Sequence, residues 1–186
     1  MGFDSRYRTA ALSSLAVTAL AALHLAYEHS NGGVVSHHLL ARPDLPLISN
    51  WLELAVLPVL GWLFGWRLHG RSAAGSPTRA GAPRSFWFAA GGAFAYGALL
   101  AGGFEFGVSD LTSALFYGLF LIAVALPVYR VEFLLGFVLG MTFTFGGVLP
   151  ALIGAVFGLI SLGVRLVARA VVWAARSVGR PTGGAR

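Results

Sequence analysis

The chain has 186 residues, of which 57% are hydrophobic and only 11% are charged. Soluble domains carry about 25% charged residues, so this composition excludes an ordinary soluble globular protein. The sequence has no Cys, which excludes a disulfide scaffold and a thiolate metal site. All 13 basic residues are Arg, and without Lys no Schiff-base cofactor can be attached.

The distribution of apolar residues predicts an all-α, polytopic integral membrane helical bundle that forms a single membrane domain over residues 1–186. A transmembrane helix needs about 20 mostly apolar residues. A turn signal at Gly146, Gly147 and Pro150 divides the last long apolar stretch into two helices. The six predicted transmembrane helices are 9–27, 51–66, 85–103, 111–129, 131–149 and 150–173.

Arginine placement predicts the orientation of this bundle. With the N-terminus in the cytoplasm, six spans place Arg42 alone on the outer side and every other Arg on the inner side. We therefore predict that both the N- and C-termini are cytoplasmic. The acidic residues fall toward the outer side: Glu28, Asp44, Glu53, Glu105 and Asp110. Topology thus explains the net charge of +6, and we expect no nucleic acid partner.

Three segments outside the spans carry separate expectations. Residues 67–84 are rich in Gly, Ser, Pro and Arg, which predicts a flexible inner loop, and residues 181–186 are expected to be a disordered tail. Residues 28–50 form a long, partly apolar outer loop, in which we expect a helical turn led by Ser36. An alternative, in which the first helix is a cleaved signal peptide, stays open.

Two features of the helices indicate partners. Arg165, Arg169, Arg176 and Arg180 project on one side of the last helix, where they would contact anionic lipid headgroups or simply anchor the helix. Small-residue patterns such as Gly136-x-x-x-Gly140 indicate close helix packing in the bilayer. They would also suit a homo-oligomer or a membrane complex.

The candidate chemistry lies at the outer end of the first helix, where four of the five His residues are close in sequence. His24 and Glu28 share one helical face, a single turn apart, and such a pair can chelate an ion. Gly32 and Gly33 would let the chain turn back. The predicted metal ligands are His24, Glu28, His29, His37 and His38, with Glu53 as a weaker candidate. Imidazole and carboxylate ligands suit Zn, Cu, Fe or Mn. Glu28 and Glu105 are weak candidates for a general base.

Structural interpretations compete with this chemistry. The cluster could be a hydrogen-bonded polar cap of the outer loop. Asn50-x-x-Glu53 has the spacing of a capping box, with Glu53 folded back onto the helix start. Glu132 would interact with its helix dipole and pair with Arg130.

Three functional hypotheses follow for a bacterial inner-membrane protein, a location suggested by the Ala-, Gly- and Arg-rich composition. The first is a metal-binding membrane protein, which could be an enzyme. The second is a small channel or transporter with an outer vestibule of His and acidic side chains. The third is an accessory subunit of a membrane complex.

Overall fold

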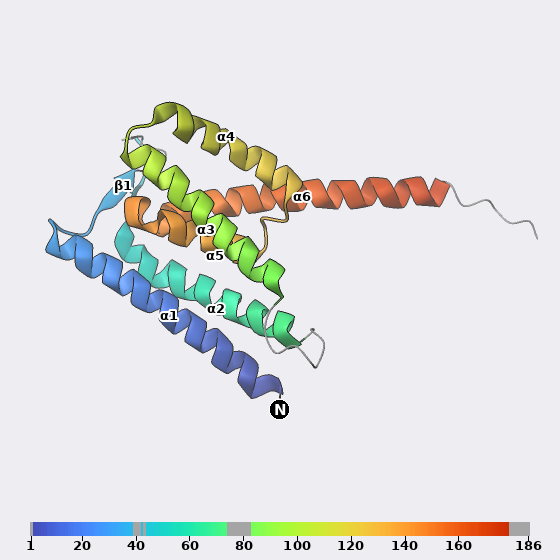
Figure 1. The fold of residues 1–186 in the computed structure, drawn as a ribbon, viewed down its shortest axis with the longest axis horizontal. Helices are drawn as coiled ribbons and strands as arrows, with labels where there is room; N and C mark the ends of the chain where they lie inside the picture. Colours follow the sequence, from blue (N-terminus) through green and yellow to red (C-terminus); the bar gives the residue numbers. More distant parts are fainter. Residues whose placement is uncertain (1, 39–41, 43, 74–82, 179–186) are drawn as a thin grey trace, which may run out of the picture.

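A computed structural model describes residues 2–38, 42, 44–73 and 83–178, and confirms the all-α fold. Six helices account for most of it (Figure 1). They are α1 (Gly2–Ser30), α2 (Glu53–Ala73), α3 (Arg84–Glu105), α4 (Ser109–Ala125), α5 (Val131–Phe145) and α6 (Val148–Val178). Four helical segments are long and apolar enough to cross a membrane: Asp4–Ser30, Asn50–Ser72, Arg84–Glu105 and Val148–Ser177. Helices α4 and α5 are apolar but shorter, so the count of six spans stays a prediction.

The helix boundaries differ from the sequence prediction at several ends. Helix α1 begins earlier than predicted. Helix α2 continues to Ala73, so the first residues of the predicted inner loop at 67–84 are helical. The rest of that loop, 74–82, and the tail 181–186 lie outside the described residues. The break between the last two helices is confirmed, because α5 ends at Phe145 and α6 begins at Val148.

The outer loop forms a short hairpin, and the predicted helical turn at Ser36 was wrong. Strand β1 (Ser36–His38) pairs antiparallel with β2 (Leu47–Ser49), and His37 lies opposite Ile48. The backbone amide of Asn50 extends the pairing by donating a hydrogen bond to the Val35 carbonyl at 3.1 Å. A 3-10 turn, η2 (Asn50–Leu52), then leads into α2. These backbone bonds explain why extended structure replaces a helical turn here.

Helix α5 lies in the middle of the bundle, where it contacts α2, α3 and α6, while α1 packs along α2. Glycines permit the closest of these approaches. A Cβ added to Gly65 of α2 would lie 2.6 Å from the Thr9 carbonyl of α1, and one added to Gly97 of α3 would lie 2.5 Å from the Phe137 carbonyl of α5. Such small-residue contacts are typical of helix packing in membranes.

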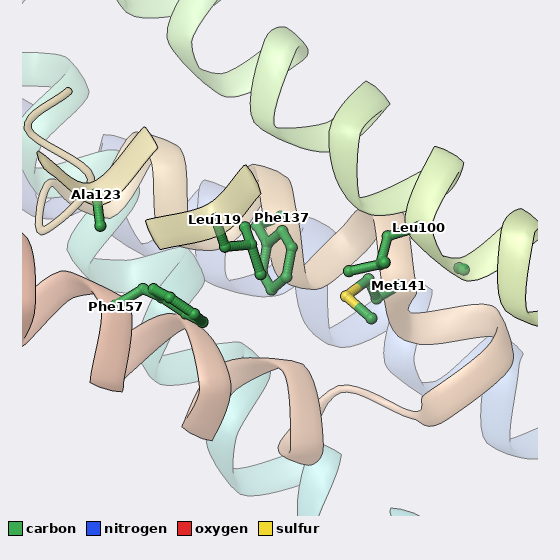
Figure 2. Packing of buried hydrophobic residues seen from close by; sticks show 7 residues of the cluster. Leu100, Leu119, Ala123, Phe137, Met141 and Phe157 are labelled. Carbon is green, nitrogen blue, oxygen red and sulfur yellow. The ribbon is translucent and has the colours of Figure 1, made fainter. Parts of the chain in front are cut away.

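Two apolar clusters fill the bundle. One joins α3, α4, α5 and α6, with Leu119, Phe137 and Phe157 among its members (Figure 2). The other joins α1, α2 and α5 and contains Val17, Ala21, Leu57, Leu60, Leu135 and Val138. Many large apolar side chains point outward instead, such as Leu15 and Leu23 of α1 at 65% and 68% exposure. In a bilayer these side chains would contact lipid, which accounts for the high apolar content of the chain.

The two ends of the bundle differ in charge. The basic end, as we call it here, carries Arg6, Arg67, Arg84 and Arg130. Arg6 lies 3.8 Å from the ring centroid of Trp66, and Arg67 forms an ion pair with Glu132. The opposite end carries the hairpin and the turn between α5 and α6. This separation places the acidic and His-rich segment away from most arginines, as the sequence predicts.

Candidate functional site

A buried polar cluster, formed by His24, Glu28, Asn50 and Glu53, lies at the hairpin end of α1 and α2. All four residues are buried, with exposures of 8%, 9%, 2% and 0% respectively. The cluster joins α1, the hairpin, the start of α2 and the α5–α6 turn. Buried polar groups require partners, and each of these side chains has at least one.

The His24 imidazole lies between two carboxylates. Its Nδ1 is 3.2 Å from Glu53 Oε2, within hydrogen-bond distance. Its Nε2 is 3.6 Å from Glu28 Oε1, which is longer than a hydrogen bond. Since the two ring nitrogens point in different directions, the two carboxylates approach different edges of the ring.

Glu28 is held by the segment that flanks the hairpin. The Asn50 side-chain amide donates to Glu28 Oε1 at 2.7 Å, and the Val35 amide donates to Glu28 Oε2 at 3.2 Å. Both oxygens therefore accept a hydrogen bond from a chain segment that follows α1. Glu28 consequently connects the end of α1 to the entry of α2.

Glu53 is held by the turn between α5 and α6, where the Gly147 amide donates to Glu53 Oε1 at 2.7 Å. Gly146 has a positive φ of 69°, which favours glycine, and a Cβ there would collide with the Asn50 side chain. The two glycines thus let the turn approach the cluster closely. Glu53 does not fold back onto Asn50, so the capping-box interpretation was wrong. Instead, the Ser49 side chain accepts a hydrogen bond from the Trp51 backbone amide and caps the 3-10 turn η2.

The cluster contains more acidic than basic side chains. It contains two carboxylates and one imidazole, and the described ion pairs bring no arginine to it. With ionised carboxylates its net charge is −2 for a neutral imidazole and −1 for a protonated one. Burial of an uncompensated charge is costly, so a bound cation would stabilise the cluster.

Aromatic rings lie beside the cluster. The Phe143 ring of α5 is 5.9 Å from the His24 ring and 5.4 Å from the Tyr27 ring, centroid to centroid. The Phe143 ring thus covers one side of the imidazole. A less hydrated site strengthens electrostatic interactions within it.

Of the predicted ligands, the structure brings together His24, Glu28 and Glu53. His29 is exposed, His37 is half-buried on β1, and His38 is exposed with its Nδ1 2.9 Å from the Leu45 carbonyl. Within the described ranges, no three His, Cys, Asp or Glu side chains are arranged to hold one metal ion. Glu105, the weak general-base candidate, is exposed at the last turn of α3.

Sequence reasoning missed several contributors to the site. The Asn50 side chain and the amides of Val35 and Gly147 were not predicted to contact the carboxylates. The spacing of Asn50 and Glu53 and the paired glycines at 146–147 were visible signals, but they were assigned to local helix ends.

The basic end contains a second buried carboxylate. Arg67 Nε is 2.8 Å from Glu132 Oε2, and Glu132 is 1% exposed. Glu132 therefore pairs with Arg67 of α2, and the predicted pairing with Arg130 was wrong. Helix α2 passes beside the start of α5, which makes this non-local partner available.

We compared the chain with protein-family models, with curated proteins and with solved structures, and none of these comparisons found a match.

Proposed function

We propose that the chain is a bacterial inner-membrane protein that binds one transition-metal ion at its outer face, between His24 Nε2 and Glu28. The observation that carries this proposal is the 3.6 Å separation between His24 Nε2 and Glu28 Oε1. Nitrogen and oxygen ligands lie about 2.0–2.2 Å from Zn²⁺, so two tetrahedral ligands are about 3.4 Å apart. The two atoms thus face each other at a separation close to that of a chelating pair.

The contact between His24 and Glu53 supports the same assignment. A carboxylate at Nδ1 favours the tautomer with the proton on Nδ1, which leaves the lone pair on Nε2 for a metal. Metal-binding histidines commonly have such a carboxylate at the nitrogen that does not bind the metal. In this arrangement Glu53 orients the ligand, while Glu28 binds the ion.

The negative charge of the cluster also favours a cation. A divalent ion would compensate the two carboxylates, and neutral imidazole with carboxylate oxygen suits Zn, Cu, Fe or Mn. Two protein ligands would leave positions for water or for a further side chain. His37 is the best-placed candidate for the further ligand, because it lies two residues beyond Val35, whose amide contacts Glu28.

A channel or transporter has less support. Between the polar cluster and the Arg67–Glu132 pair lies the apolar cluster of α1, α2 and α5, with Leu57 and Val138 fully buried in it. The members of that cluster carry no ionisable side chain. A pathway for charged solutes usually contains polar groups at this depth.

A zinc titration tests the proposal. Detergent-purified protein, stripped with a chelator, is titrated with Zn²⁺ in competition with a chromophoric chelator. We expect one ion per chain. Glu28→Gln should weaken binding about 100-fold or more because it removes a ligand. Glu53→Gln should weaken it about 10–100-fold because it removes the carboxylate at Nδ1.

The matched controls are His29→Ala and His38→Ala, which alter exposed histidines outside the cluster. Both should bind Zn²⁺ as the unchanged protein does, whereas His37→Ala should bind more weakly. Equal affinities for Glu28→Gln and the unchanged protein would contradict the proposed site.

A further inference from the structure

A second site is indicated by a cavity of about 630 Å³ among α3, α4, α5 and α6. None of its lining residues belongs to the polar cluster. Its walls are mostly apolar, with Phe88 and Gly92 on α3, Ile122 on α4 and Phe157 on α6. The volume is in the range of small-molecule sites. The predominantly apolar walls point to a hydrocarbon ligand.

Helices α3 and α4 lie close at the turn that joins them and separate toward the basic end (Figure 1). The Tyr96 hydroxyl donates to the Leu115 carbonyl at 2.5 Å and lies against Gly118, which holds the two helices together. Phe137 and Phe157, which Figure 2 shows among the buried side chains of the core, also line the cavity. Phe88, at 76% exposure, lies at its edge.

Three arginines belong to segments that line this cavity or contact them. Arg84 directly precedes the lining residue Ser85, and Arg130 follows the lining residue Val128 by two positions. Arg165 reaches the same place, because its guanidinium donates to the Ala125 carbonyl at 3.0 Å, next to the lining residue Leu126.

The charge at this rim is positive. Among the described residues that line the cavity, none is acidic. Glu132, the acidic residue nearest in sequence to Arg130, is engaged by Arg67 of α2. Within the part of the chain that the structure describes, no ion pair is found for Arg84, Arg130 or Arg165.

We propose that this cavity binds an acyl chain of an anionic phospholipid whose phosphate contacts Arg84, Arg130 and Arg165. Apolar walls and a basic rim match the two parts of such a lipid, and basic pockets on the cytoplasmic side of helices are suited to anionic headgroups. This site is separate from the polar cluster and does not depend on metal binding.

Two glycines provide a matched pair of variants. Gly92 lines the cavity, whereas its neighbour Gly91 does not, and a Cβ at either position meets no atom within 4 Å. Leucine at Gly92 would therefore occupy the cavity without forcing helices apart. Leucine at Gly91 gives the same change in composition outside the cavity.

The experiment is native mass spectrometry of the delipidated protein with palmitoyl-oleoyl phosphatidylglycerol, and with the corresponding phosphatidylcholine. We expect one tightly bound phosphatidylglycerol per chain and at least tenfold weaker phosphatidylcholine binding. Gly92→Leu should weaken phosphatidylglycerol binding at least tenfold, and Gly91→Leu should leave it unchanged. Arg130→Gln should reduce the preference for phosphatidylglycerol while retaining phosphatidylcholine binding.

Equal lipid binding by Gly92→Leu and Gly91→Leu would overturn the proposal, because the lipid would then lie elsewhere. A dimer that dissociates in Gly92→Leu would also overturn it, since a second copy of the chain would be the occupant. Equal affinity for the two lipids would contradict the proposed contact between the arginines and an anionic headgroup.

Discussion

Gly140→Ala is expected to destabilise the protein by about 2–3 kcal/mol, although alanine normally favours a helix by about 1 kcal/mol over glycine. The added Cβ would lie 2.8 Å from the Ala98 amide nitrogen and collide with the Phe94 carbonyl. Both obstacles are backbone atoms of α3, which no rotamer change can move. The α3–α5 interface must therefore separate along its length.

The matched control is Gly102→Ala, because a Cβ at Gly102 meets nothing within 4 Å. This variant should be neutral or stabilised by up to about 1 kcal/mol. The measurement is the midpoint of unfolding in detergent for both variants. If Gly140→Ala unfolded at the same midpoint as Gly102→Ala, the close α3–α5 packing would be wrong.

His24→Leu is expected to cost about 3–5 kcal/mol, because it removes the imidazole from between two buried carboxylates. Leucine fills a similar volume, so the loss reports the polar interactions more than a cavity. Glu53 Oε2 would lose the partner that lies at 3.2 Å, and the charge of the cluster would remain. The measurement is chemical unfolding of the chelator-stripped protein, which separates this effect from metal binding.

A double variant distinguishes charge from shape in this cluster. Adding Glu53→Gln to His24→Leu should recover part of the lost stability, since it removes one buried charge. His29→Leu is the control, because His29 is exposed and should change stability by no more than about 0.5 kcal/mol. If the double variant lost more unfolding free energy than the two single variants lose together, the result would argue against charge imbalance.

The helices were predictable because long apolar runs have few other ways to satisfy their backbone in a membrane. The break at Gly146 and Gly147 was visible from local turn chemistry. The hairpin was missed because each strand has only three residues, too few for an alternating pattern to show. Its pairing depends on a partner strand eight residues away.

The site was predictable in part, because Glu53 was a weaker candidate from its place at the outer end of its helix, while the spacing of His24 and Glu28 gave the stronger signal. His24 and Glu28 are one helical turn apart, so their proximity followed from helix geometry. Asn50 and Glu132 were assigned to local roles, but each contacts a residue of another segment: Glu28 for Asn50 and Arg67 for Glu132. Non-local helix packing decides such pairs, and periodicity alone does not predict it.

The most direct test of the metal site is elemental analysis of protein purified from membranes without a chelator, beside Glu28→Gln and His29→Ala. The proposed site predicts about one transition-metal ion per chain in the unchanged protein and in His29→Ala, and a loss of metal in Glu28→Gln. Metal-free protein in all three samples, or equal metal in all three, would contradict an ion held between His24 and Glu28.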